Sequence, residues 1–166
     1  MKKVFIALLF MTCFTIVKAQ DSAYYRKNIE LLIKDAQNEF ATAQGSLVDE
    51  DSTKQRSFYK SNIDLKCGQS FIQKNFDDNS KVAVFYYDLS NDDDLMHSLT
   101  FLNVALGVIN EMHSSGKYRG KDFTNDDEST TTELKDTDGN YIAQLTSSSK
   151  DKYMKFLVYS KKWGKR

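Results

Sequence analysis

The sequence contains no proline, only two cysteines and seven glycines, and its formal charges cancel. Without a proline-rich or glycine- and serine-rich stretch there is no candidate linker, and no internal repeat is visible at solenoid periods. A chain of 166 residues is therefore expected to form one domain. The balance of 23 basic and 23 acidic side chains gives no support for nucleic-acid binding. A hydrophobic content of 40% is sufficient for a packed core and excludes general disorder.

The first residues have the pattern of an export signal. Two lysines precede an apolar run over residues 4–17, and the small residue Ala19 follows it. This run is shorter than the ~20 residues that a membrane-spanning helix needs, so no stable membrane anchor is expected. We predict a signal peptide over residues 1–19 and a single α+β domain over residues 20–166. The protein would then be periplasmic or secreted, and a bacterial origin fits the short leader.

The two cysteines occupy different parts of this scheme. Cys13 lies inside the expected signal, so lipidation there is an alternative to cleavage after Ala19. After cleavage Cys67 is the single remaining thiol, and no internal disulfide can form. The fold must therefore be stable through its core alone.

Apolar periodicity predicts the elements of the first half. A stripe with three- and four-residue steps indicates a helix over about residues 22–44, ended by Gly45. The polar stretch 46–56 is expected to be an exposed loop. A period of two from residue 58 to residue 89 predicts about three strands, including a strand from Phe58 to Cys67. The run 81–89 is apolar on both parities, which predicts a central strand covered on both faces.

A second helix is expected over about residues 93–113, after a capping stretch rich in aspartate. Its polar stripe is narrow, so the helix should be largely buried. The main apolar face is predicted to contain Leu95, Leu99, Leu102, Leu106 and Ile109.

The remaining sequence again favours β structure. Three further strands are expected, over residues 129–134, 141–146 and 153–160. Asp138 and Gly139 are typical of a hairpin turn, whereas residues 117–128 are too polar for an assignment. The expected fold is α+β, with two long helices packed on an antiparallel sheet of about five to six strands in the order α-βββ-α-βββ.

Residues with catalytic chemistry are few. The sequence contains no phosphate-binding glycine loop, serine elbow, CxxC pair or HExxH motif. Cys67 continues the inward parity of Ile63 and Leu65, which favours a buried thiol over a nucleophile. Catalytic use of this cysteine would require His97 or His113 as a base within hydrogen-bond reach.

Metal binding has equally weak support. His97 and His113 are sixteen positions apart on one expected helix, which corresponds to ~24 Å and is too far to share an ion. The acidic residues 92–94 are explained by helix capping, and the DTDGN segment by a turn. We therefore predict no metal and no cofactor.

Aromatic residues are concentrated on the expected strands. In the run 153–160 one parity mixes lysine with aromatic residues and is expected to be exposed, while Met154, Phe156 and Val158 should point inward. A partly open aromatic sheet face is suited to binding a partner. The predicted binding residues are Tyr153, Lys155, Tyr159 and Trp163.

These features favour an exported protein that acts by binding, possessing no recognisable catalytic centre. Its partner is expected to be another protein, as for an inhibitor or immunity-type protein, and not nucleic acid. One alternative is a hydrolase or transferase with an unusual site that uses Cys67 or His97. Another is a carrier of a small apolar ligand, with a cavity beneath Leu99, Phe101 and Val108. The sequence predicts no particular oligomeric state.

Overall fold

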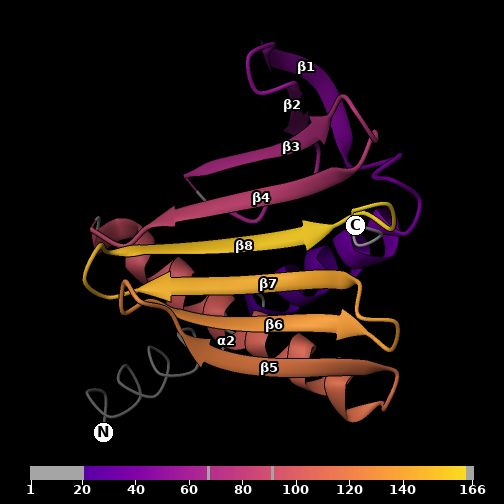
Figure 1. The fold of residues 1–166 in the computed structure, drawn as a ribbon. Coiled ribbons are helices and arrows are strands. Elements are labelled where there is room, and N and C mark those ends of the chain that lie inside the picture. Colours follow the sequence, from indigo (N-terminus) through magenta and orange to yellow (C-terminus); the bar gives the residue numbers. More distant parts are fainter. Residues whose placement is uncertain (1–20, 67, 91, 164–166) are drawn as a thin grey trace, which may run out of the picture.

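The computed structural model describes residues 21–66, 68–90 and 92–163 (Figure 1). A first helix, over residues 21–36 of the described chain, is followed by four strands, and a second helix is followed by four more. The elements after the first helix are β1 (Gln44–Asp51), β2 (Arg56–Ser61), β3 (Gln69–Asn75), β4 (Lys81–Asp88), α2 (Asp92–Ser114), β5 (Tyr118–Thr124), β6 (Thr130–Asp136), β7 (Tyr141–Ser148) and β8 (Tyr153–Tyr159).

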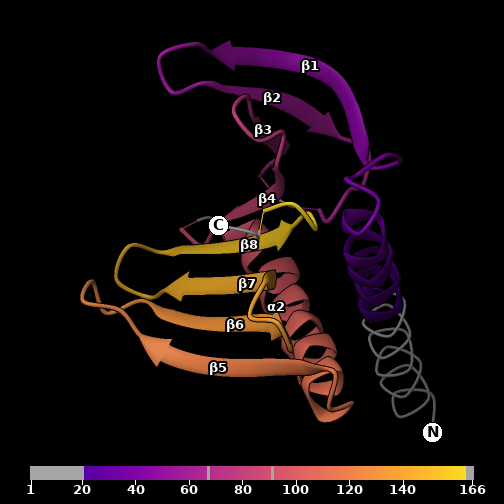
Figure 2. The ribbon, with the colours of Figure 1, turned by 45° about the vertical axis from the view of Figure 1, so that its right-hand side comes forward.

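All eight strands form one antiparallel sheet in the order β1-β2-β3-β4-β8-β7-β6-β5. Each half of the chain is one helix followed by a four-stranded meander, and the last strands of the two halves, β4 and β8, pair at the centre. Both helices lie on the same face of the sheet, and Figure 2 shows them on one side of the strands. No helix of the described residues covers the other face.

The predicted class, helices on an antiparallel sheet, is confirmed, but each half contains one strand more than expected. The additional strands are β1, predicted to be a loop, and β5, in the unassigned stretch. Both are edge strands. Along β1 the exposed fractions of Leu47 and Val48 are 52% and 67%. A strand that is exposed on both faces has no need of alternating hydrophobicity, so periodicity gives no signal for it.

The first helix is shorter than expected because an acidic side chain closes its last turn. The carboxylate of buried Asp35 accepts hydrogen bonds from the backbone N–H groups of Thr42 at 3.0 Å and Ala43 at 2.7 Å. Glu39 and Phe40 both have a φ of 57°, which turns the chain out of the helix. Phe40 and Ala43 are nevertheless fully buried. The apolar spacing therefore identified core positions correctly, although these two are not helical.

The second helix agrees closely with its predicted bounds, but its buried face differs. Phe101, Ala105, Val108 and Ile109 are buried, whereas Leu99 is 45% exposed. Apolar residues occupy most of the helix surface, so periodicity alone could not select the face. The Phe101 ring decides the orientation, since it packs into an aromatic cluster between the helices and the sheet.

This aromatic cluster is the centre of the core. The Phe101 ring centroid lies 4.8 Å from that of Tyr87, 5.4 Å from that of Phe156 and 5.6 Å from that of Tyr25. The Phe85 ring lies beside Phe156 at 6.5 Å, where β4 pairs with β8. The core thus joins the first helix, α2 and the two central strands into one packed unit.

Two expectations about the first-half strands were wrong. β2 ends at Ser61, and the buried residues Ile63 and Leu65 lie beyond it in an irregular segment. The hydroxyl of Tyr87 donates to the carbonyl oxygen of Leu65 at 2.7 Å, which fixes this segment without strand pairing. In the part of the chain that the structure describes, helices cover only one face of the central strand β4 (Figure 2), and Val84 and Tyr86 on its other face are half-buried.

Candidate functional site

The uncovered face has a hollow over the three strands β3, β4 and β8. These strands pair in register, so the outward side chains form rows across the sheet. The rows are Gln69, Tyr86 and Lys155; Phe71, Val84 and Leu157; and Gln73, Val82 and Tyr159. Together with Trp163 these nine side chains line a hollow of about 410 Å³.

The hollow exists because small side chains stand between large ones. Val82 and Val84 occupy successive outward positions of the central strand β4, with Tyr86 at the next outward position. The aromatic side chain of Tyr159 stands beside Val82 on the neighbouring strand. Phe71 stands beside Val84 on β3. The floor is therefore aliphatic, and half of the eight side chains around it are aromatic.

Tyr159, expected to be exposed, is only 7% exposed. The rings of Tyr141 and Trp163 pack against it at centroid distances of 5.4 Å and 5.7 Å. Its hydroxyl donates to Oε1 of Gln144 at 2.7 Å. Burial raises the pKa of this phenol well above its ordinary value, and the neighbouring Tyr141 and Glu133 raise it further. This wall of the hollow is thus neutral and held in place by its neighbours.

A β-bulge brings Tyr141 to this side of the sheet. Leu134 pairs with Ala143, but the next residue of β6, Lys135, pairs with Tyr141. The extra residue, Ile142, is buried on the core side. Tyr141 therefore shares a face with Lys135, whose Nζ lies 4.1 Å from the centroid of the tyrosine ring. The bulge is what allows Tyr141 to support Tyr159.

The four residues predicted from sequence are gathered at this hollow. Lys155, Tyr159 and Trp163 line it, and Tyr153 lies beside it, stacked on Tyr86 at 6.0 Å with an interplanar angle of 14°. Lys155 is the only charged residue among the described residues that line the hollow. The predicted alternation of β8 agrees with the structure, since its other face is buried.

Sequence reasoning missed the contributions of β3 and β4. Phe71 on β3 and Val84 on β4 form most of the apolar middle row with Leu157. The alternation of β3 was visible, but nothing in the sequence showed that β4 pairs with β8. The hollow could not be assembled without that pairing.

Strand β2 adds positive charge beside the hollow. Its outward residues are Arg56, Phe58 and Lys60, which pair with β3 on the same face. The Phe58 and Phe71 rings contact each other edge to face at 5.5 Å. The guanidinium of Arg56 donates from Nη1 to Oε1 of Gln73 at 3.4 Å. Lysine and arginine therefore flank the hollow on the β2 side, opposite Lys155 on β8.

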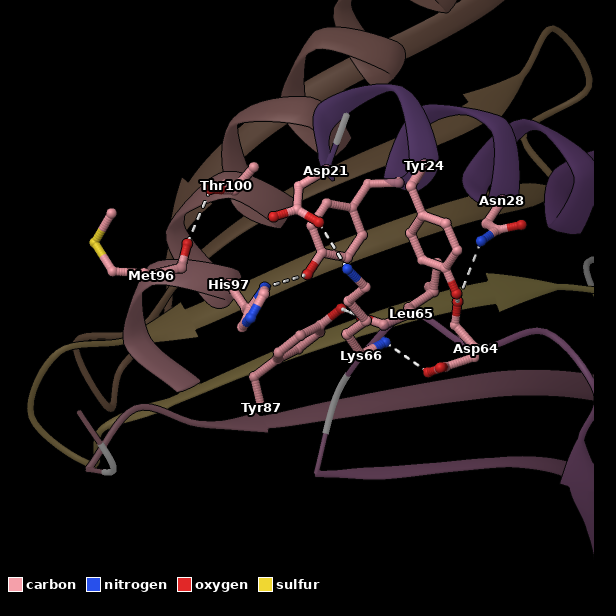
Figure 3. Close-up of polar contacts among 11 residues, drawn as sticks. Asp21, Tyr24, Asn28, Asp64, Leu65, Lys66, Tyr87, Met96, His97 and Thr100 are labelled. Atoms are coloured by element: carbon pink, nitrogen blue, oxygen red, sulfur yellow. Dashed lines mark hydrogen bonds and ion pairs between the residues drawn. The ribbon is translucent and has the colours of Figure 1, made fainter. Parts of the chain in front are cut away.

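The polar contacts around His97 lie on the other side of the molecule, between the helices and the segment before β3 (Figure 3). The hydroxyl of buried Tyr25 lies 3.2 Å from Nδ1 of His97, which joins the first helix to α2. Lys66 forms an ion pair with Asp21 at 2.6 Å. This ammonium group, through its hydrogen bond, lowers the pKa of the Asp21 carboxyl. The contacts tie three segments together, and Cys67 lies outside the described residues.

His113 has a separate role near the other end of α2. Its Nδ1 accepts a hydrogen bond from the backbone N–H of Gly120 at 3.0 Å, which attaches the helix to β5. Among the described residues, no three histidine, cysteine, aspartate or glutamate side chains lie close enough together to hold a metal ion. His97 and His113 are thus engaged with different neighbours on one continuous helix.

A second hollow, of about 310 Å³, lies between the two helices and β5. Its apolar lining includes Ile33, Val108 and Met112. Of the three residues expected above an apolar-ligand cavity, only Val108 lines this hollow, because Phe101 is packed in the core and Leu99 is exposed. The hollow follows the line where the helices meet.

No family model, curated protein or solved structure matches this chain. Within the ranges that the structure describes, no helix has the length and apolar character needed to cross a membrane.

Proposed function

We propose that this is an exported protein that acts by binding another protein through the uncovered face of its sheet, in the manner of an inhibitor or immunity-type protein. The observation that supports this proposal is the hollow of about 410 Å³ over β3, β4 and β8. Export is inferred from the leader pattern of residues 1–19.

The hollow has the composition of a protein-binding surface. Apolar side chains that remain partly exposed, here Phe71, Val84 and Leu157, gain stability when a partner removes them from water. Tyrosine and tryptophan are enriched among the residues that dominate binding energies. Because Tyr159 is fixed by its neighbours, little side-chain entropy is lost when a partner binds there.

Site-specific photo-crosslinking in the native host tests this function. A benzophenone amino acid is placed at Leu157 in the hollow or, as a matched control, at the exposed Leu31 of the first helix. We expect a discrete protein adduct from position 157 and none from position 31. The substitution Val84→Arg, which fills the hollow with a charge, should abolish the adduct while circular dichroism and the melting temperature stay close to those of the parent. An adduct at 157 that persists with Val84→Arg would contradict the proposal.

Intact mass of the native protein tests export separately. Recovery from the periplasm or medium without residues 1–19 is expected, and lipidation at Cys13 would give a larger mass with a shorter truncation. A full-length chain in the cytoplasmic fraction would contradict this part of the proposal.

A further inference from the structure

We propose that the partner presents an extended acidic segment to the hollow, with two carboxylates on either side of one large apolar side chain. This inference rests on the proposed function and adds to it the chemistry of the partner. Its basis is the distribution of charge around the hollow, the spacing of the flanking lysines and the apolar row between them.

The charged side chains next to the hollow are positive, and the acidic ones on the same face lie one step further away. Asp49 and Asp51 on β1 pair with Phe58 and Arg56, and Asp88 on β4 pairs with Tyr153. Lys155 lines it on β8, Lys60 is exposed on β2, and Arg56 reaches Gln73 in its wall. No carboxylate lies among the described residues of the lining. On the β6 side of the same face, Glu133 is paired with Lys135 at 3.0 Å and so adds little net charge. An acidic segment that crosses the hollow between Lys60 and Lys155 therefore meets a lysine at each end, whereas Asp51 beside Arg56 offsets part of the charge of that guanidinium.

The positions of the lysines fix the spacing of the expected carboxylates. Lys60 pairs with Phe71, and that row continues through Val84 to Leu157. From β2 to β8 there are three inter-strand steps of about 4.8 Å, which gives about 14 Å across the strands. Lys155 lies on β8, two residues along from Leu157. A lysine side chain is long enough to span this two-residue offset along β8.

An extended peptide matches this spacing. At about 3.3 Å per residue, positions i and i+4 are about 13 Å apart, and positions i, i+2 and i+4 point to the same side. Carboxylates at i and i+4 can therefore meet Lys60 and Lys155, while the side chain at i+2 enters the hollow over Val84. The volume of about 410 Å³ is at the small end for a ligand pocket, which suits one large side chain.

The alternative polyanion, single-stranded nucleic acid, fits less well. Such a strand is held by a basic groove that follows many successive phosphates. Here the cations are few, and an aliphatic floor lies between them. The geometry therefore favours a peptide, and RNA serves as a competing probe in the test.

The test measures fluorescence anisotropy of labelled heptapeptides with the folded exported chain. The probes are GESWSEG, the neutral GQSWSQG, the basic GKSWSKG and GESSSEG, which lacks the central ring, together with a labelled decauridylate. At low salt the acidic peptide is expected to bind about five- to tenfold more tightly than the neutral one, because each exposed ion pair contributes about two- to fivefold. This advantage should shrink in 0.5 M salt. GESSSEG should bind more weakly than GESWSEG.

Reversing the charge of the two flanking lysines gives a more decisive test than the peptide series alone. The double variant Lys60→Glu/Lys155→Glu should invert the preference, so that the basic peptide binds more tightly than the acidic one. The control Lys27→Glu/Lys117→Glu changes the net charge equally at exposed positions on the first helix and before β5, and should keep the original order. Circular dichroism and melting temperature confirm that both variants are folded.

Three results would overturn this inference. Equal binding of the acidic and neutral peptides, with both lost in Val84→Arg, would remove the acidic partner but leave the proposed function intact. Tighter binding of the decauridylate than of GESWSEG would replace the peptide with nucleic acid. Absence of peptide binding at millimolar concentration would also refute the inference. The crosslinking experiment at Leu157 would then still test the proposed function independently.

Discussion

The two halves of this chain share one topology but use it differently. In residues 21–88 a helix of moderate length precedes the meander β1–β4, and β1 has two register shifts against β2. In residues 92–159 a longer helix precedes β5–β8, and the edge strand β5 pairs regularly with β6. The covered faces of both meanders contribute to one core. The shared core thus constrains the two halves in the same way, whereas the helix lengths and the pairing of the edge strands differ.

The uncovered face shows the larger difference. In the first half it is aromatic and aliphatic, with Phe58 and Phe71 in contact and Val84 beside them. In the second half the ion pair of Glu133 with Lys135 occupies the corresponding face of β6. The hollow forms where these two surfaces meet, at the β4–β8 pair. The same arrangement of helix and strands can therefore have an apolar surface in one half and a charged surface in the other, because residues outside the core are free to vary.

The largest expected effect is on stability, and it distinguishes two neighbouring residues of β8. Phe156 lies on the covered face of the sheet and Leu157 on the uncovered face. Phe156→Ala removes a fully buried ring and should lower the free energy of unfolding by about 3–5 kcal/mol. Leu157→Ala, at a half-buried position on the uncovered face, should cost about 1 kcal/mol or less. Urea unfolding measures both. Equal losses would mean that the two faces are covered to the same extent.

The next effect compares the two helix ends. The first helix ends through the Asp35 carboxylate, whereas α2 is followed by Gly116 with a φ of +76°. Asp35→Ala leaves two backbone N–H groups without their acceptor and should cost about 2–3 kcal/mol. Gly116→Ala should cost about 1 kcal/mol, because alanine tolerates this conformation poorly. Thermal or urea unfolding of the two variants should give this order, and a reversed order would refute it.

A smaller effect compares the glycines of the two edge strands. A methyl group at Gly45 would lie 2.7 Å from Oδ1 of Asn62 and 3.0 Å from the carbonyl oxygen of Lys60. At Gly120 the nearest atom would be Cγ of His113, at 3.4 Å. Gly45→Ala should therefore destabilise the protein by about 1–2 kcal/mol, and Gly120→Ala by a few tenths. Melting curves of the two variants measure the difference. Equal shifts in melting temperature would show that both edge strands accommodate the methyl group equally well.

The smallest effect concerns the ion pair that joins the first helix to the segment before β3. The pKa of Asp21 is lowered by Lys66, so the pair stabilises the fold above the unfolded-state pKa of about 3.9 and is lost as the pH falls through the folded-state value. Asp21→Asn should cost less than about 1 kcal/mol at pH 7 and nothing at pH 2. The exposed Asp126→Asn serves as the charge-matched control in urea unfolding. A loss that is the same at both pH values would exclude the ion pair as its cause.

Most of the covered structure could be predicted from the sequence, because burial on one face imposes a period. The expected helix 93–113 and the strands 81–89, 141–146 and 153–160 lie within two residues of α2, β4, β7 and β8 at each end. The missed strands are the two edges. β1 is exposed along most of its length, and β5 is largely polar although α2 contacts it, so neither strand shows an apolar period. The overextended first helix has another cause. Phe40 and Ala43 keep the helical spacing while Asp35 ends the helix through contacts seven and eight residues away.

The candidate site was predicted only in part. The alternation of β8 placed Lys155 on an open face, and the structure brings it to the hollow together with Trp163, a predicted binding residue beyond the strand. Tyr159 was expected to be exposed, but its burial depends on Tyr141, which a bulge in β7 turns toward it. A bulge leaves almost no mark on composition or periodicity, since it inserts a single residue.

The sequence by itself determined which residues are apolar, where their spacing changes from helical to extended, and hence the α+β class. Only the tertiary structure decided that β4 lies beside β8, that both helices cover the same face, and that two valines stand between aromatic walls. The reason is physical. Local periodicity records whether a side chain is buried, whereas strand pairing joins segments far apart in the chain through backbone hydrogen bonds that are the same for every residue type.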